Sequence, residues 1–221
     1  MLKTNILSEI INIIYPTVCL ICKRPTKEEL CKKCKMFLNR QLVSGIEDYS
    51  KDNEKNFKEL MYLYIYDNII RKLILQYKFQ DKSYLYKIFS KKIKNNEKIC
   101  LFLKKYDIII PVPISKKRMK QRGYNQSALF AKEISKQFNM EYCDKCLLKD
   151  KHTVPQSSLN KEERIKNIEN VYSIKNKEKI LNKEVLLIDD IYTTGNTVNE
   201  CSRILKTAGA NNIGILTIAK D

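Results

Sequence analysis

The stretch VLLIDDIYTTGNT, residues 185–197, decides the fold that we predict for this chain. Its first four residues are apolar and mostly branched, a pattern typical of a strand buried on both faces of a parallel sheet. Asp189 and Asp190 follow where that strand is expected to end, and open α/β sheets bind their ligands at this edge. A run of small polar residues then leads into a helical pattern that begins at Val198.

The residues after the two acids have the chemistry of a phosphate site. Hydroxyl groups and the free backbone N–H groups of a helix N-terminus both favour an anion. The alternative is an ordinary strand, turn and helix cap, where Asp, Thr and Asn are expected anyway. We favour a ligand site because two adjacent acids at a buried strand end, with no basic residue before Arg203, are costly unless they meet a ligand or a cation.

Over its full length, this stretch resembles the 13-residue phosphoribosyl-pyrophosphate (PRPP) motif of type I phosphoribosyltransferases. The resemblance implies that Asp189 and Asp190 hold the ribose hydroxyls and belong to the catalytic site. It also implies that the residues after them cradle the 5′-phosphate of PRPP: Thr193, Thr194, Gly195, Asn196 and Thr197.

The composition indicates one α/β domain with a small appendage. The 221 residues are 43% hydrophobic and 30% charged, and Lys and Arg outnumber Asp and Glu by 42 to 25, a net charge of +17. Such a charge favours nucleic acid, phosphorylated small molecules or an anionic membrane surface, although a lysine-rich solvated surface has the same composition. The single histidine, His152, excludes any site that needs two imidazoles.

Two features of the N-terminal part bear on localisation. Residues 2–14 have the spacing of an amphipathic helix closed by Pro16, and the apolar pattern of residues 6–15 is too short to span a bilayer. No secretory signal is visible. We expect a cytoplasmic protein with no integral membrane segment.

Two CxxC pairs close together predict a zinc site in the N-terminal module, of the zinc-ribbon kind. Each pair presents two thiolates, and together they complete a tetrahedral four-sulfur shell. The alternative is two disulfides or four reduced thiols. Four thiolates leave no open position for chemistry, so the expected role of Zn²⁺ is structural, and its binding would drive the folding of this small segment. The predicted ligands are Cys19, Cys22, Cys31 and Cys34.

A third CxxC pair, Cys143 and Cys146, is not expected to bind a second zinc. The other cysteines that could complete a site, Cys100 and Cys201, fall inside predicted core elements. We expect two unremarkable cysteines near a strand.

A basic segment follows the predicted strand at residues 106–113, which ends in a Pro-x-Pro turn. Residues 116–123 are read as a basic loop that ends in Gly123. At the carboxyl end of a central strand such a loop would neutralise phosphate or pyrophosphate, with Lys117 and Arg122 as candidate ligands. The alternative is a solvated basic loop.

The rest of the chain predicts alternating strands and helices, and hence a mostly parallel sheet with flanking helices. Tyrosines on the first two helices could stack on bases, but we favour packing as their role. Residues 44–56 are read as a linker or surface loop and residues 149–170 as a long functional loop. The expected strands are 57–66, 171–174 and 213–219, and the expected helices are 68–79, about 83–94 and 127–138.

Several further motifs extend the resemblance to nearly the full chain: YKF at 77–79, PVP at 111–113, RGYNQ at 122–126 and QSSLNKEERIKN at 156–167. With the cysteines and the PRPP motif, they are similar to the ComF family, also called ComFC, of the bacterial competence system. The resemblance places Arg164 at the family's arginine position, as a catalytic candidate. One position departs from the family, whose members commonly carry a basic residue and a threonine before the glutamine: His152, mostly neutral at pH 7, stands before Thr153 in place of the expected arginine.

The family resemblance implies a type I phosphoribosyltransferase-like fold preceded by a four-cysteine zinc module. The implied boundaries are 1–45 for the N-terminal helix and zinc module and 46–221 for the phosphoribosyltransferase-like domain. Within the latter, residues 46–105 form a lead-in and residues 106–221 form the PRPP-binding core.

The implied function is a role in natural transformation, with binding of single-stranded DNA beside a helicase-like ATPase in the cytoplasm, at the inner face of the membrane through partners. Mg²⁺ and PRPP are the implied ligands of the phosphate site. The alternative is an active phosphoribosyltransferase on a base or nucleotide. No motif for the attacking base stands out, so the sequence leaves the question of enzymatic activity open.

Overall fold

The computed structural model describes residues 17–149 and 171–221, and every structural statement below concerns these two ranges. Three predicted features lie outside the described residues: the helix at 2–14, nearly all of the loop at 149–170, and within that loop the candidate residue Arg164 together with His152 and Thr153.

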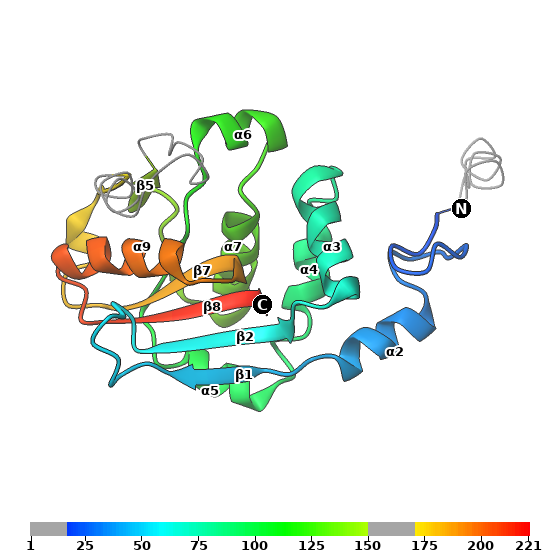
Figure 1. Ribbon diagram of the computed structural model, residues 1–221, viewed down its shortest axis with the longest axis horizontal. Helices are drawn as coiled ribbons and strands as arrows, with labels where there is room; N and C mark the ends of the chain where they lie inside the picture. The colour runs from blue at the N-terminus through cyan, green and yellow to red at the C-terminus, as the bar shows by residue number, and fades with distance from the viewer. Residues whose placement is uncertain (1–16, 150–170) are drawn as a thin grey trace, which may run out of the picture.

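A six-stranded sheet forms the centre of the described ranges (Figure 1), with the order β1-β2-β8-β7-β3-β4. Neighbouring strands run parallel, except that β1 pairs antiparallel with β2. The predicted mostly parallel sheet is therefore confirmed. Its strands are β1 (Gly45–Asp48), β2 (Glu59–Ile65), β3 (Ile108–Pro111), β4 (Glu141–Tyr142), β7 (Glu184–Tyr192) and β8 (Asn212–Lys220).

The central strand β7 is apolar on both faces, as its sequence predicts. Leu186 and Ile188 belong to one core cluster, and Val185 and Leu187 belong to the other. The strand is longer than the predicted residues 185–188, because its pairing with β8 continues as far as Tyr192. The two acids therefore lie inside the last part of the strand and not after it.

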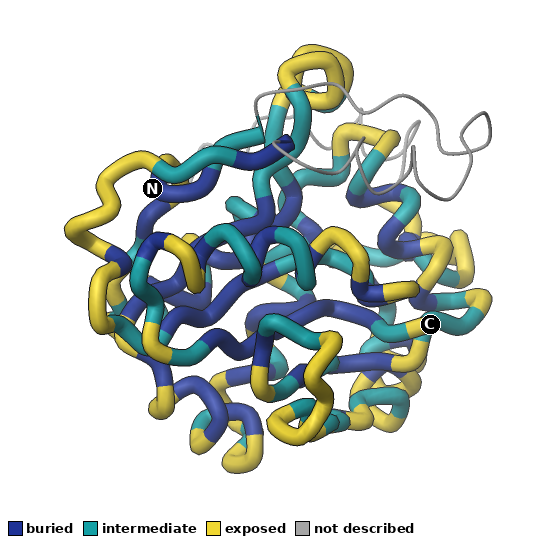
Figure 2. Tube along the Cα trace, turned by 60° about the vertical axis from the view of Figure 1, so that its left-hand side comes forward, coloured by how far each residue is buried: buried dark blue, intermediate teal, exposed yellow. Residues whose placement is uncertain are grey.

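Helices cover both faces of the sheet. One face packs against α3 (Asn68–Phe79), α4 (Leu85–Ser90), α5 (Glu97–Leu103) and α7 (Gln126–Phe138). The other face packs against α9 (Asn196–Thr207) and a two-stranded antiparallel sheet of β5 (Leu147–Lys149) and β6 (Tyr172–Ile174). Figure 2 shows the buried stretches running through the middle of this three-layer arrangement.

Several predicted elements need correction. Part of the stretch read as a linker forms the edge strand β1, which gains backbone hydrogen bonds from β2 without an apolar face. The helix predicted at 83–94 ends at Ser90. The strand predicted at 171–174 joins the small sheet, not the central one. The helix α5 and the short 3-10 helix Lys177–Lys179 have no counterpart in the prediction.

The basic segment read as a loop is the helix α6 (Lys116–Arg122). The Ser115 hydroxyl accepts from the Arg118 N–H and caps the N-terminus, and Gly123 ends the helix in the left-handed region with φ of 73°. A serine N-cap and a glycine C-cap both favour a short helix between them.

The cysteine segment packs on the same core as α3 and α4. Leu20, Leu30 and Leu38 are buried in that cluster, and the Gln76 side chain donates to the Leu20 carbonyl oxygen at 3.1 Å. Its first CxxC pair forms a turn bounded by a bridge between Val18 and Pro25, while the second pair begins the helix α2 (Lys32–Arg40). A helix thus stands where a zinc ribbon would have a second hairpin.

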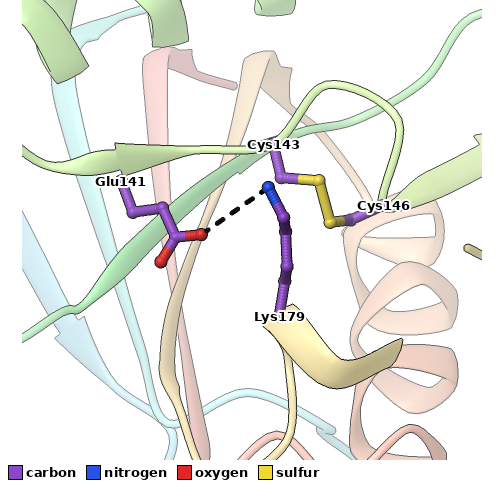
Figure 3. Close-up of a disulfide and its surroundings, with 4 residues drawn as sticks. All are labelled: Glu141, Cys143, Cys146 and Lys179. Atoms are coloured by element: carbon purple, nitrogen blue, oxygen red, sulfur yellow. Dashed lines mark ion pairs between the residues drawn. A yellow bond between two sulfur atoms is a disulfide. The ribbon is translucent and has the colours of Figure 1, made fainter. Parts of the chain in front are cut away.

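Cys143 and Cys146 form a disulfide, so the expectation of two unremarkable cysteines is wrong. The turn between β4 and β5 brings their Cα atoms to 5.5 Å, within the range that a disulfide spans. Figure 3 shows the disulfide beside the ion pair of Lys179 with Glu141, whose charged atoms are 4.0 Å apart.

No helix in the described part of the chain is both long enough and apolar enough to cross a bilayer.

Candidate functional site

The two acids of β7 face different neighbours, as expected for successive side chains of a strand. Asp190 contacts Lys78, in the last turn of α3 on one face of the sheet. Asp189 lies where its charge acts on Lys149 and Tyr172, which belong to the small sheet on the other face. The strand therefore places Asp190 against α3, while Asp189 lies between the small sheet and the first turn of α7.

The cation that the acids need comes from the chain itself. The Lys78 Nζ lies 2.9 Å from the Asp190 Oδ1, and the two side chains are only 19% and 13% exposed. A partly buried pair like this is costly to break from one side, because the remaining charge is left without a partner. Proximity along the sequence could not reveal it, because the two residues belong to distant segments.

Asp189 is held by two donors. The Ser127 hydroxyl donates to its Oδ1 at 3.0 Å, and the backbone N–H of Asp190 donates to the same oxygen at 2.8 Å. Burial and the neighbouring charge of Asp190 raise the pKa of Asp189 to about 7, against the lowering effect of these donors and of Lys78. A cation or a hydrogen-bond donor bound beside this carboxyl group would favour its ionised form.

The loop after the acids lines a pocket of about 50 Å³, several times the roughly 15 Å³ that one water needs. The pocket lies at the start of α9, whose first residue is Asn196 and which no described side chain caps. Uncapped N–H groups and the helix dipole make such a position favourable for an anion. All predicted loop residues line it: Asp189, Thr193, Thr194, Gly195, Asn196 and Thr197.

Gly195 is required at the entry to α9 for two reasons. Its φ of 76° lies in the left-handed region, and a Cβ there would meet the Tyr192 hydroxyl at 2.4 Å. The close approach of this ring to the backbone shapes the floor of the loop.

The helix α6 brings one of its two candidate residues to the acids. The Arg122 Nη1 donates to the Gln126 Oε1 at 3.1 Å. Burial and Arg118 lower the pKa of Arg122, and the nearby charge of Asp190 opposes them. Lys117 is exposed, and no hydrogen bond or ion pair joins it to the described residues. The structure therefore places Arg122 near Asp190 and leaves Lys117 on the outer surface of α6.

Three residues near the acids escaped sequence reasoning as site residues: Lys78, Ser127 and Lys149. Arg118 belongs to the basic segment 116–123, which the sequence predicts as a phosphate-neutralising segment. Burial and Arg118 lower the pKa of Lys149, while Cys201 and Asp189 raise it, so Lys149 lies close to both Arg118 and Asp189. The one usable sequence signal was the YKF motif that contains Lys78. Nothing in the local sequence marks Lys149, because its role comes from the pairing of β5 with β6.

The four N-terminal cysteines meet the geometric requirement for a metal. All four Sγ atoms lie within 4.8 Å of one another. The Cys22 and Cys31 sulfurs are 3.7 Å apart, close to the roughly 3.8 Å edge of a tetrahedron with Zn–S bonds of about 2.3 Å. Burial raises the pKa of Cys19, but backbone donors, chiefly of Cys22 and Cys31, bring it to about 6.

Comparison with known proteins agrees with this geometry. The family described as "Phosphoribosyl transferase domain" matches residues 125–221. Competence protein F of Haemophilus influenzae is 28% identical over 152 residues, which is 67% of this chain and 66% of that protein. Competence protein ComFC of Streptococcus pneumoniae is 30% identical over 158 residues, which is 72% of this chain and 66% of that protein.

Among solved structures, the glutamine PRPP amidotransferase from B. subtilis, complexed with ADP and GMP, aligns with 60% of this chain and 25% of its own at 16% identity. Its TM-score of 0.41 is too low to carry an argument.

The parallel sheet, the loop after β7 and the matched domain define a type I phosphoribosyltransferase-like fold, with a cysteine cluster before it. The two competence proteins match most of the chain, including residues before that domain. The chain belongs to the ComF/ComFC family. It spans about two thirds of the length of these two relatives.

The pKa of Asp189 predicts how stability depends on pH. An aspartyl pKa raised from 3.8 to about 7 means that the folded state holds a proton that the unfolded state has lost, so stability falls as pH rises from about 4 to about 7. Asp189→Asn removes this ionisation and keeps an oxygen for Ser127. We expect it to stabilise the ligand-free protein by on the order of 1 to 3 kcal/mol at pH 8, and by less at pH 5.

Urea unfolding at the two pH values measures this difference. Asp144→Asn, at an exposed position of the β4–β5 turn, is the matched control and should show no pH-dependent gain. An equal effect of Asp189→Asn at both pH values would contradict the assignment.

Proposed function

We propose that this chain is a DNA-uptake protein of the competence system that binds single-stranded DNA and carries a PRPP-type phosphate site. One observation carries the proposal: Asp189 and residues 191–198 line a pocket at an uncapped helix N-terminus. The names of the relatives support the competence role. The proposed setting is the cytoplasm, beside a helicase-like ATPase, at the inner face of the membrane through such partners.

In this proposal the loop and the acids bind different parts of PRPP. Thr193, Thr194 and Thr197 offer hydroxyls and the start of α9 offers N–H groups to the 5′-phosphate, an arrangement that favours a dianion. Asp189 and Asp190 accept hydrogen bonds from the ribose hydroxyls. Gly195 and Asn196 shape the loop between them.

The basic groups around the acids suit the pyrophosphate part of PRPP. Arg122 acts close to Asp190, Lys149 acts close to Asp189, and Arg118 acts close to Lys149. Bound Mg²⁺ would add neutralising charge on the pyrophosphate oxygens. Lys117 and Arg164, which the resemblance assigns to the site, complete the proposed set; Arg164 lies outside the described residues.

A basic helix next to this site suits the DNA backbone. Every residue from Lys116 to Gln121 is exposed, and no ion pair joins a basic residue of α6 to a carboxylate of the described residues. Unpaired basic groups on a chain of net charge +17 give a sequence-independent hold on phosphates.

The second candidate function is an active phosphoribosyltransferase that acts on a base or a nucleotide. The observation in its favour is that Asp189 and the complete loop line one pocket, with Asp190 next to Asp189 on the same strand. In that reaction a nitrogen nucleophile attacks the anomeric carbon of PRPP while basic groups hold the departing pyrophosphate.

Zn²⁺ bound by Cys19, Cys22, Cys31 and Cys34 has a structural role in this proposal. Buried Leu20, Leu30 and Leu38 tie the cysteine segment to the central core, so the metal would fix how this segment meets α3. We propose residues 1–45 as the module that contains the metal and residues 46–221 as the phosphoribosyltransferase-like domain.

The zinc proposal predicts one zinc per chain. Cys22 is the most exposed of the four ligands, so Cys22→Ser should release the metal with little direct loss of packing. Elemental analysis after dialysis measures it, and Cys100→Ser, outside the cluster, should keep its zinc. A wild-type protein without metal would contradict the proposal.

The DNA proposal predicts a change in salt dependence. Neutralising Lys116, Lys117 and Arg118 to glutamine should lower the affinity for single-stranded DNA. It should also reduce the slope of log K against log salt by up to roughly 2, because each lost phosphate contact contributes about 0.7. Fluorescence anisotropy at several salt concentrations measures both quantities.

A charge-matched control uses three exposed lysines of the segment around α5: Lys94, Lys98 and Lys104. This segment leads into β3 and therefore lies at the amino ends of the parallel strands, whereas the acids lie at their carboxyl ends. Glutamine at these positions gives the same net charge. Equal slopes for the two triple variants would show that α6 is not the contact surface.

A further inference from the structure

Phe79 is an aromatic side chain that the core does not use. It ends α3 and is 65% exposed, more than any other large apolar side chain of the described residues. Two positions earlier on the same helix, Tyr77 is fully buried, so the predicted packing role of the helix tyrosines is confirmed there. Because the helix packs well without Phe79, its exposed ring has no structural role in the core.

A guanidinium group covers this ring. The central carbon of the Arg122 guanidinium lies 4.7 Å from the centroid of the Phe79 ring, within the range of a cation–π contact. The Arg122 Nη1 donates to the Gln126 Oε1 at 3.1 Å, and Gln126 is itself buried. This hydrogen bond to a buried side chain restrains the position of the Arg122 guanidinium group.

The two segments that carry Phe79 and Arg122 are joined by two hydrogen bonds, one donated from each segment. The Tyr77 hydroxyl donates to the Gln126 carbonyl oxygen at 2.7 Å, and the Tyr124 hydroxyl donates to the Tyr77 carbonyl oxygen at 2.5 Å. In Figure 1 the carboxyl-terminal end of α3 points toward α6 across this junction. The exposed ring therefore stands on a rigid support.

This junction adjoins the acidic pair. Lys78, the residue before Phe79, contacts Asp190 at 2.9 Å, and the charge of Asp190 acts on Arg122. A group stacked on the Phe79–Arg122 pair would therefore lie beside the ribose end of the proposed phosphate site.

We propose that Phe79 and Arg122 form a stacking platform for a nucleobase beside Asp190. Every nucleobase has a flat π face that stacks on an aromatic ring or a guanidinium plane, without dependence on sequence. This inference rests on the proposed function and adds that the bound ligand contributes a nucleobase. The base comes either from a strand of DNA bound along α6 or from a free nucleotide, and the experiment distinguishes these sources.

The chain contains no tryptophan, so Phe79→Trp introduces a single fluorescent reporter at the platform. The full chain is titrated with oligothymidylate, with an abasic strand of the same length, and with thymidine monophosphate. A stacked base quenches the indole, so the platform predicts quenching by oligothymidylate and little by the abasic strand. Quenching by the mononucleotide as well would identify a free nucleotide as sufficient.

Leu101→Trp is the matched control. Leu101 is 56% exposed on α5, at the opposite edge of the sheet, and its reporter should respond to none of the three ligands. Phe79→Ala supplies an independent readout: it should weaken oligothymidylate binding roughly five- to hundred-fold and leave abasic-strand binding unchanged.

The outcomes separate this inference from the proposed function. If both strands bind the wild type and Phe79→Ala weakens neither, the platform is overturned while DNA binding stands. If neither strand binds and the mononucleotide does not quench the reporter, the platform and the DNA-binding function both fail.

Discussion

The whole site depends on placing two adjacent carboxylates at the end of a buried strand. Such a pair is unfavourable unless each charge finds compensation. Lys78 compensates Asp190 by direct contact, and Asp189 is left with hydroxyl and N–H donors and a pKa raised to about 7. The compensation is therefore uneven. Asp190 is fixed as part of an ion pair, and Asp189 has a raised pKa that a bound cation would lower.

This constraint links parts of the chain that are distant in sequence. Lys78 is positioned by α3, which also packs on the cysteine segment through the Gln76 contact with Leu20. Ser127 comes from the first turn of α7, and Lys149 from the small sheet on the other face. The central strand thus gathers three layers around its last residues. A metal that orders the cysteine segment would help to hold α3, and with it the cation that Asp190 requires.

The central strand, the loop after it and the parallel sheet could be predicted because a local sequence pattern determines them. This pattern is a continuous apolar run, followed by two acids and then by small polar residues. The helix at residues 68–79 was predicted at its observed bounds, because an apolar stripe and the Asp67 cap define it. The α6 helix was missed because five basic residues without an apolar stripe look like a loop. The Lys78–Asp190 pair was missed because it follows from tertiary packing between distant segments. The disulfide was missed because CxxC spacing also occurs in metal sites and in free cysteines, and only the turn between β4 and β5 distinguishes these cases.

Calorimetric titration of PRPP with Mg²⁺ is the decisive test of the proposed PRPP site at the acids and the loop. We expect the wild-type protein to bind PRPP and Asp189→Asn/Asp190→Asn to lose this binding, with the double variant shown to be folded by circular dichroism. Asp144→Asn should bind as the wild type does. If the wild-type protein binds no PRPP, or if the folded double variant binds it with unchanged affinity, the proposed site is wrong.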